Sequence, residues 1–362
     1  MTGQSCFAAD YAQARDMFCA AARAADAAIE SIPHPDRGPS GGVLSCDTAW
    51  LGPKTAPHVL VTISGTHGVE GFAGSGAQVD ALRRIAGSSL PADVAVLMVH
   101  AINPHGFAWA RRVTEDNIDL NRNWIDFTAP LPLNKGHDAL APALYPTEWN
   151  DAAQASLLAA ITDYAAQHGA AAMQAAISGG QYCHPRGIFY GGAKPGWSRR
   201  TQTALLTGML GHAEQVVIID FHTGLGPRGI GEQIVTVPRS SPQFARASAF
   251  FGAAITSTHD GSSSSAVLVG DGLSAAPALL PHAKVTAMAL EFGTVPEDQV
   301  VAALAADAWL HAHGDPLSPQ GRAISANVRR AFYDDSTDWQ GMVVCQALLA
   351  CRQAIAALHR KA

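Results

Sequence analysis

The chain has 362 residues, of which 48% are hydrophobic and 15% charged, and its formal net charge at pH 7 is -6. This apolar content can form a large core and excludes a wholly disordered chain. The acidic balance, with no run of Lys and Arg longer than a pair, argues against nucleic acid as a partner.

The N-terminal segment has the pattern of an amphipathic helix. Apolar residues recur at helical spacing from Tyr11 to Ile29, and Asp10 and Gln13 have the spacing of a capping box. The basic start and apolar centre of a signal peptide are missing from this segment. Because no uninterrupted apolar stretch approaches the roughly 20 residues of a membrane span, we expect no membrane association.

The cysteines indicate a reducing compartment. The six of them form no CxxC pair and no dense framework. This is typical of reduced thiols in a cytoplasm, and it argues against a metal site built from cysteine. We therefore expect a cytoplasmic protein.

The rest of the chain alternates between strand and helix patterns. The four apolar segments that predict buried strands are 58–65, 93–102, 215–222 and 284–292, and helical patterns such as 76–87 and 296–313 lie between them. This alternation is typical of an α/β fold with a mixed, largely parallel central sheet and helices on both faces. The length is within reach of one large domain, so we expect a single catalytic domain over residues 1–362.

An irregular insertion is expected around residues 125–212. It contains an Ala-rich helical pattern at 151–169, followed by a segment rich in Gly and aromatic residues at 178–197. We interpret the latter as a loop or hairpin that forms part of a pocket wall. The Ser- and Gly-rich segment at 259–272 is typical of a mobile loop.

Chemically reactive side chains follow all four predicted strands, and they are His67 with Glu70, Asn103 with His105, His222, and Glu291. Ligand sites in parallel α/β folds gather beyond the carboxyl ends of the strands. Catalytic zinc is commonly held by two His and one Glu, with one position left open. The residues His67, Glu70 and His222 supply such a set.

Each of these residues, taken singly, also has a purely structural interpretation. Glu70 could be an acidic residue favoured by a helix N-terminus. The neighbours Arg111 and Arg112 could be a solvated pair, and Asp119 could cap a turn. Glu291 fits such an interpretation least, because an unpaired carboxylate at the end of a buried strand costs several kcal/mol.

The motifs taken together resemble a known superfamily. HxxE at 67–70, DLNRN at 119–123, DFHT at 220–223 and the late Glu291 resemble, in this order, the zinc carboxypeptidase (M14-like) superfamily, which includes succinylglutamate desuccinylases and aspartoacylases. The resemblance covers roughly residues 58–295. The segments RRVTEDNIDLNRNW and GIFYGGAKPGWS make the chain most similar to a bacterial DUF2817-type branch of that superfamily.

The resemblance implies a role for each matching residue. His67, Glu70 and His222 would bind one Zn²⁺ per chain, and Glu291 would be the general base. Arg112 would hold the oxyanion, with Arg111 as the alternative, because the spacing before DLNRN varies in the superfamily. Asn121 and Arg122 would bind a free carboxylate of the substrate, and Asp119 would orient His67.

The implied activity is zinc-dependent hydrolysis of an amide bond in a small peptide or an N-acyl amino acid that bears a free carboxylate. An aspartoacylase-like deacylase is the alternative within enzymes, and a catalytically silent zinc-binding module is the alternative of another class. The carboxypeptidases have a tyrosine between the third ligand and the catalytic Glu. Here none occurs between His222 and Glu291, so either Tyr182 or Tyr190 substitutes for it or the role is absent, as in the acylase-like relatives. The oligomeric state stays open, a homo-oligomer included.

Overall fold

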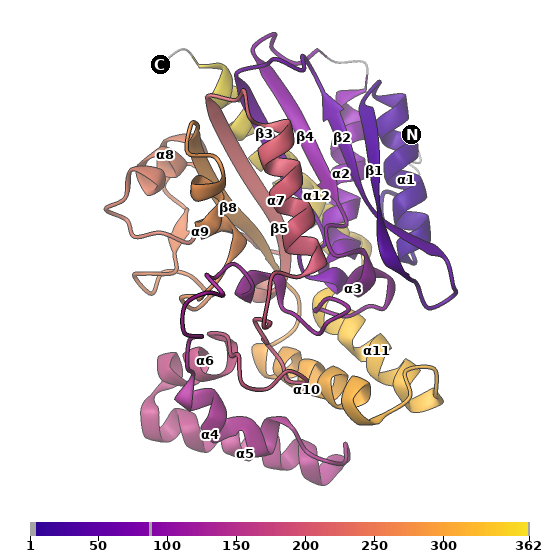
Figure 1. Cartoon of the computed structure of the whole chain (residues 1–362), viewed down its shortest axis with the longest axis vertical. Helices are drawn as coiled ribbons and strands as arrows, with labels where there is room; N and C mark the ends of the chain where they lie inside the picture. Colours follow the sequence, from indigo (N-terminus) through magenta and orange to yellow (C-terminus); the bar gives the residue numbers. More distant parts are fainter. Residues whose placement is uncertain (1–4, 87–88, 361–362) are drawn as a thin grey trace.

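The computed structural model describes residues 5–86 and 89–360. The strands within these ranges are β1 (Ala28–Arg37), β2 (Val43–Leu51), β3 (His58–Ile63), β4 (Val94–His100), β5 (Gln215–Arg228), β6 (Gly231–Val235), β7 (Thr256–Ser257) and β8 (Lys284–Gly293). They form one sheet in the order β1-β2-β4-β3-β5-β8-β6-β7 (Figure 1). The central strands β4, β3, β5 and β8 are parallel, whereas β1, β2 and β6 pair in antiparallel fashion.

The helices cover both faces of this sheet. They are α1 (Tyr11–Ala24), α2 (Gly71–Ile85), α3 (Pro104–Ala108), α4 (Lys135–Leu144), α5 (Asp151–His168), α6 (Ala170–Ser178), α7 (Trp197–Met209), α8 (Pro242–Phe251), α9 (Gly272–Leu279), α10 (Glu297–His313), α11 (Pro319–Phe332) and α12 (Thr337–His359), with short 3₁₀ turns η1 (Gly68–Glu70) and η2 (Leu120–Arg122). The predicted mixed, largely parallel sheet with helices on both faces is confirmed.

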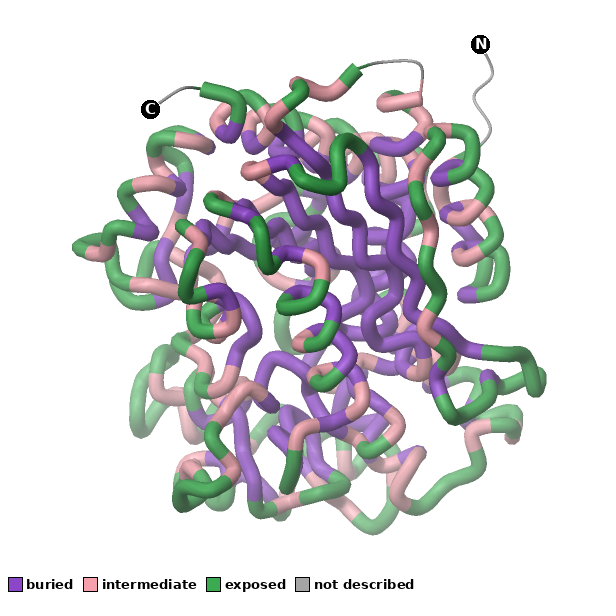
Figure 2. The backbone as a smooth tube through the Cα atoms, turned by 45° about the horizontal axis from the view of Figure 1, so that its top comes forward, coloured by how far each residue is buried: buried purple, intermediate pink, exposed green. Residues whose placement is uncertain are grey.

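Two apolar cores lie on the two sides of the sheet because alternate strand residues point in opposite directions. On β8, Met288 and Leu290 belong to the core shared with α2, α8 and α12, whereas Ala287 and Ala289 belong to the core beneath α7 and α9. Figure 2 shows the central strands buried along their length. All four strands predicted from apolar segments are therefore inner strands of one rigid sheet.

The N-terminal helix is confirmed, although it is shorter than its pattern. The carboxylate of Asp10 accepts a hydrogen bond from the backbone N–H of Gln13 at 2.8 Å and caps α1. The helix ends at Ala24, and the edge strand β1 follows from Ala28. Asp26 between them has φ 54, a left-handed conformation that ends a helix.

Within the described residues, α12 is the one helix that is long and apolar enough, by length and composition, to cross a membrane. Its buried residues Trp339, Val343, Ala347, Ala350 and Leu358 recur at helical spacing. The helix contacts α2, α8 and strands β3 and β5. A stripe of this kind is what a helix packed on a sheet requires.

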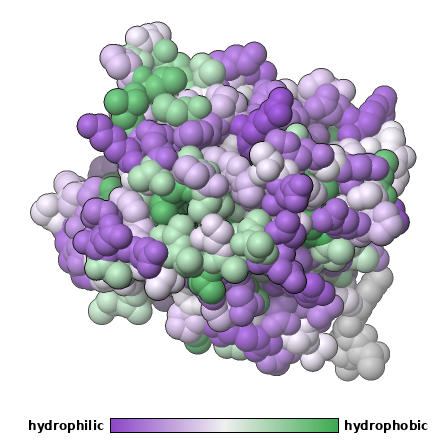
Figure 3. All heavy atoms as spheres, turned by 90° about the horizontal axis from the view of Figure 1, so that it is seen from below, coloured by the Kyte–Doolittle hydropathy of each residue, from purple (hydrophilic) through white to green (hydrophobic). Residues whose placement is uncertain are grey.

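The segment around residues 125–212 is more regular than its sequence indicates. It contains α4, α5 and α6, and the side chains of Asn134 and Asn150 cap the first two. These helices form a layer with α10 beyond the carboxyl ends of the central strands (Figure 1). Leu133 and Leu158 of this layer are exposed, and Figure 3 shows apolar residues between hydrophilic ones on this side of the molecule. Residues 179–196 stay irregular, apart from one bridge between Gln181 and Tyr190.

Candidate active site

A sharp turn after β3 presents His67 and Glu70. Gly65 has φ 71, which permits the turn, and a Cβ on Gly68 would lie 2.0 Å from the carbonyl carbon of Gly106 in α3. The backbone N–H of Gly68 donates to the carbonyl of Arg112 at 3.0 Å. The glycines therefore allow α3 and the segment that contains Arg112 to approach the turn. The residues His67 and Glu70 are buried there, with exposed fractions of 4% and 1%.

His222 and Glu291 lie side by side on neighbouring strands. They are register partners in the parallel pairing of β5 with β8, directly before the register shift that follows Thr223, and Glu291 lies near the carboxyl end of β8. Both residues are buried, with 3% and 7% exposure. The prediction that strand-end residues meet at one edge of the sheet thus holds for these two side chains.

Three potential ligands converge on one point. His67 Nδ1 lies 2.9 Å from Glu70 Oε1, and His222 Nδ1 lies 2.9 Å from Glu70 Oε2. The two Nδ1 atoms are 3.2 Å apart. Two imidazole nitrogens this close need a proton or a cation between them, because two lone pairs, or two N–H groups, repel each other. The donor set of two imidazoles and one carboxylate therefore fits Zn²⁺.

A carboxylate orients each of the two imidazoles from behind. His67 Nε2 lies 3.2 Å from Asp119 Oδ1, and His222 Nε2 lies 3.0 Å from Asp220 Oδ2. The hydroxyl of Thr66 donates to the Asp220 carboxylate at 2.9 Å. Such carboxylate partners fix the tautomer, so that Nδ1 is left free for a metal ion.

Asp220 is a residue that the sequence analysis missed. It lies two positions before His222 on β5, and residues two apart on a strand point to the same face. This spacing was a usable signal. Asp220 and Glu70 also act on the pKa of His222: although burial acts in the opposite direction, the two carboxylates raise this pKa well above its usual value.

Glu291 has the environment of a proton-transfer group. Burial and the negative charge of Glu70 raise the pKa of Glu291 to about 8. Its Oε1 accepts one hydrogen bond, from the backbone N–H of Leu225 at 3.1 Å. A carboxylate with a raised pKa next to a ligand set is a typical candidate for a general acid or base.

The two adjacent arginines have different surroundings. Arg112 donates to Asp119 Oδ2 at 2.9 Å and to Glu70 Oε1 at 3.0 Å, and it lines the cavity beside the ligand set. Arg111 instead donates to Asp307 of α10 and to Asn117, each at 2.9 Å. Arg111 is not among the described residues that line this cavity, because its guanidinium is buried against Asp307 instead.

Arg122 is buried at 2% exposure and retains free donors. Its Nε and Nη2 donate to the carbonyl of Ser178, and its Nη1 donates to the carbonyl of Asn121. A guanidinium has five N–H donors, so that two remain. Burial lowers the pKa of Arg122, and its closest carboxylate, Asp119 Oδ1, is 3.8 Å from Nη1. Asn121 lies next to it, with Nδ2 3.4 Å from His222 Nε2.

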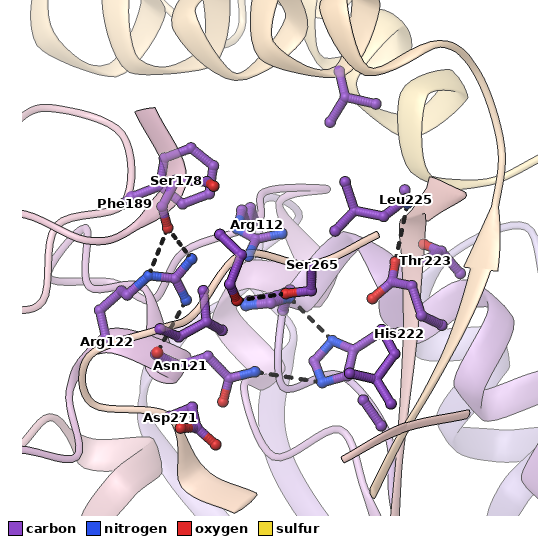
Figure 4. A pocket seen from close by; sticks show the side chains of 18 of the residues that line it. Arg112, Asn121, Arg122, Ser178, Phe189, His222, Thr223, Leu225, Ser265 and Asp271 are labelled. Atoms are coloured by element: carbon purple, nitrogen blue, oxygen red, sulfur yellow. Dashed lines mark hydrogen bonds between the residues drawn. The ribbon is translucent and has the colours of Figure 1, made fainter. Parts of the chain in front are cut away.

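A cavity of about 90 Å³ joins these groups. Figure 4 shows Arg112, Asn121 and Arg122 on one side and His222 on the other. The remaining wall is mostly apolar and consists of residues from α6, α10, β5, β6 and the 265–273 loop, such as Ile177, Leu225, Leu268 and Val301. An enclosed apolar cavity with a few convergent polar groups is the usual form of a small-molecule site.

Neither candidate tyrosine reaches the cavity. The hydroxyl of Tyr182 donates to the carbonyl of Arg122 at 2.6 Å, and the carbonyl of Tyr190 accepts from the N–H of Asp119. Among the described residues that line the cavity there is no tyrosine. The expectation that Tyr182 or Tyr190 replaces the tyrosine of the carboxypeptidases therefore gains no support.

Backbone strain concentrates in the segments around the cavity. Five described residues other than glycine have positive φ, and Ala101, Ala110, Asn117 and Phe189 are four of them. Ala101 follows β4, while Ala110 and Asn117 flank the arginine pair. Sparsely populated conformations that cluster in this way are typical of functional sites, where the surroundings impose them.

Comparison with protein families gives one match over nearly the whole chain. A family model with the description "Protein of unknown function (DUF2817)" matches residues 7–346. No curated protein matches the chain.

Solved structures show a weaker likeness. Carboxypeptidase A from Helicoverpa armigera has 11% identity and a TM-score of 0.47, over 89% of this chain and 73% of that chain. Succinylglutamate desuccinylase from Chromobacterium violaceum has 14% identity and a TM-score of 0.38, over 86% and 72%. Murein-tripeptide amidase MpaA from Escherichia coli O157 has 16% identity and a TM-score of 0.36, over 85% and 93%. Similarity at this level carries no argument about activity, metal or substrate.

Proposed function

The chain belongs to the DUF2817 family, and from this premise we propose that it is a zinc-dependent hydrolase. The bond cleaved is an amide in a small peptide or an N-acyl amino acid with a free carboxylate. The observation that carries this proposal is the convergence of His67, Glu70 and His222 beside the buried Glu291. A ligand set, a base and two arginines next to one cavity are the parts that amide hydrolysis requires.

The zinc assignment rests on the donor set. His67 and His222 would contribute Nδ1, and Glu70 its carboxylate. When bound, the ion polarises a carbonyl and lowers the pKa of water toward neutrality. Asp119 and Asp220 would keep the Nε2–H tautomer of each imidazole.

Glu291 is proposed as the general base. It takes a proton from the attacking water and delivers it to the nitrogen of the leaving amine, so that the C–N bond breaks without a free amide anion. The positive charge of a bound cation would favour the carboxylate form of Glu291, which is the form that accepts a proton. A site that only binds zinc has no use for such a group, and this argues against the silent zinc module.

The arginines divide the recognition of substrate between them. Arg112 donates to Asp119 through Nε and to Glu70 through Nη1. Its Nη2 group has no acceptor in these bonds, and it suits a developing oxyanion. The two free N–H groups of Arg122, next to Asn121, suit a planar carboxylate. A substrate with a carboxylate near its scissile carbonyl satisfies both.

An aspartoacylase-like deacylase of N-acyl amino acids is the second candidate. The observation in its favour is that no tyrosine occurs among the described residues lining the cavity. Peptide chain-end cleavage and deacylation differ in what lies on the acyl side of the bond, and both keep the carboxylate on the amine side.

A substrate panel separates these functions. Zinc-loaded protein is incubated with N-acetyl amino acids, hippuryl amino acids and dipeptides, each paired with its carboxyl-terminal amide, and the released amine is measured. We expect turnover of free acids above their amides. Turnover of N-acetyl amino acids alone selects the deacylase, and one bound zinc with no released amine from any compound selects the silent module.

A further inference from the structure

Phe189 has a backbone conformation that bulky residues rarely adopt. Its φ is 52, in the left-handed region, and it lies in the irregular segment between α6 and α7. Main-chain hydrogen bonds hold it there: the carbonyl of Phe189 accepts from Gln181 N–H at 3.1 Å, and the next carbonyl, of Tyr190, accepts from Asp119 N–H at 2.8 Å. The segment is thus tied directly to the residue that lies behind the arginines.

The ring of Phe189 contacts both arginines of the cavity. Arg112 Cζ lies 5.1 Å from the ring centroid, and Arg122 Cζ lies 5.3 Å from it. The ring is 6% exposed and forms part of the cavity wall. Figure 4 shows Phe189 next to Ser178, the residue whose carbonyl receives two donors of Arg122. One aromatic ring therefore attracts two buried cations.

Two like charges this close need compensation. Asp119 supplies part of it, with contacts of 2.9 Å to Arg112 and 3.8 Å to Arg122. The negative face of the Phe189 ring supplies another part without using any N–H donor, because a cation–π contact leaves the donors in the guanidinium plane free. A carboxylate in place of the ring would have bound those donors. The ring can therefore stabilise both guanidinium groups without occupying any of their N–H donors.

We propose that Phe189 is a positioning residue that holds Arg112 and Arg122 as a pair with their free donors directed into the cavity. The site then selects a ligand whose carboxylate and carbonyl are separated by the spacing of the two guanidinium groups. This proposal rests on the proposed function, and it gives the left-handed conformation of residue 189 a role. A residue that only filled space would not need the left-handed conformation.

The experiment compares binding of 3-phenylpropionate with that of its amide, by calorimetry on the zinc-loaded protein. Because the amide has a bond that the proposed reaction can cleave, every protein in this experiment also carries Glu291→Gln, which is expected to keep its zinc and lose turnover. The two compounds differ in charge at one group. Phe189→Gly removes the ring but accepts the positive φ, so that the backbone is preserved. Phe189→Tyr keeps an aromatic face. Val301→Ala, in the α10 wall of the cavity, is the matched control.

We expect Phe189→Gly to weaken binding of the acid about tenfold, which corresponds to about 1.4 kcal/mol, and to leave the amide unchanged. Phe189→Tyr should stay within about threefold of wild type, as expected when a second aromatic face replaces the first. Val301→Ala should change both compounds equally. Equal acid preference in Phe189→Gly and wild type, or no acid preference in wild type, would overturn the proposal.

The outcomes also distinguish this proposal from the proposed function. Acid preference that depends on the ring, in a protein that releases no amine from any substrate, would sustain the role of Phe189 and reject the hydrolase. Amide hydrolysis with an acid preference that Arg122→Ala abolishes and Phe189→Gly does not would sustain the hydrolase and reject the role of Phe189.

Discussion

The two walls of the cavity are built by different means. The strand wall is formed by His67, His222 and Glu291, with the buried Glu70 in contact with both imidazoles. The register of β5 with β8 brings His222 and Glu291 together, and the turn after β3 presents His67 and Glu70. The loop wall, formed by Arg112, Asn121, Arg122 and Phe189, has no regular element longer than a 3₁₀ turn, and backbone hydrogen bonds and positive φ values hold it.

The difference suggests a division of labour. Side chains at strand ends are held by a rigid scaffold, as a metal ion and a proton-transfer group require. Side chains on loops can change with fewer consequences for the core, as recognition of varied substrates requires. We expect variants of the strand wall to alter metal binding and chemistry, and variants of the loop wall to alter the choice of substrate.

Loss of a ligand on the strand wall should have the largest effect. His222→Ala removes one of three ligand atoms, so we expect zinc affinity to fall by more than the roughly 10- to 100-fold typical of an outer-shell change. Asp220→Asn, which alters only the partner of His222 Nε2, should fall within that 10- to 100-fold range. Elemental analysis and chelator competition measure both. Full zinc content in His222→Ala would reject the ligand assignment.

Glu291 tests the chemistry of the same wall. Glu291→Gln keeps the shape of the side chain but cannot take a proton, so we expect unchanged zinc content and a fall in kcat of about 10²-fold or more. Glu214→Gln, at an exposed residue directly before β5 and away from the residues that line the cavity, is the matched control. Near-wild-type turnover by Glu291→Gln would transfer the role to Glu232, its register partner on β6, or to Glu297, which lines the cavity.

The strand wall was largely predictable from the sequence. Apolar runs that end in His or Glu predict buried parallel strands, and the carboxyl ends of such strands must meet. His222 and Glu291 follow two such predicted strands, and the structure shows that they are register partners. The roles expected of them came from the resemblance to the superfamily. Asp220 was missed although the same alternation places it on the face of His222.

The loop wall could be predicted only in part. The choice between Arg111 and Arg112 depends on a loop bounded by Ala110 and Asn117, both with positive φ. It also depends on Asp307, which binds Arg111 from 196 residues further along the chain. Composition indicated that 178–197 belongs to a pocket wall, but the contact of Phe189 with two arginines has no local sequence signal.

Arg122 should separate recognition from chemistry. Masking the substrate carboxylate as an amide leaves a buried guanidinium unpaired, which costs roughly 2–5 kcal/mol. We therefore expect wild-type kcat/KM to fall about two orders of magnitude on masked substrates. Arg122→Ala should lose activity on free acids far more than on masked ones, and Arg122→Lys should not restore the paired donors. Equal wild-type rates on both substrate forms would reject the carboxylate site, even with zinc and Glu291 confirmed.

The smallest expected effect concerns the scaffold behind the strand wall. His100 ends β4, is fully buried, stacks on Phe18 and contacts the hydroxyl of Ser75 through Nε2. Burial lowers the pKa of His100 from 6.5 to about 4. Between these values the unfolded chain binds more protons than the folded chain, so that stability falls as the pH decreases through this window. The contribution of a neutral His100 is fully present above pH 6.5.

This shift predicts a loss of about 2 kcal/mol in the free energy of unfolding between pH 7 and pH 5 from His100 alone. His100→Phe keeps an aromatic ring against Phe18 and cannot titrate, so urea unfolding of the zinc-free protein should depend less on pH by that amount. His168→Gln, exposed on α5, should retain the wild-type dependence. Because His100 lies outside the cavity, the acid preference for ligands should be the same in His100→Phe as in wild type. An unchanged pH dependence of stability in His100→Phe would mean that the scaffold of the strand wall tolerates a buried charge, and rigidity would then not be what distinguishes the two walls.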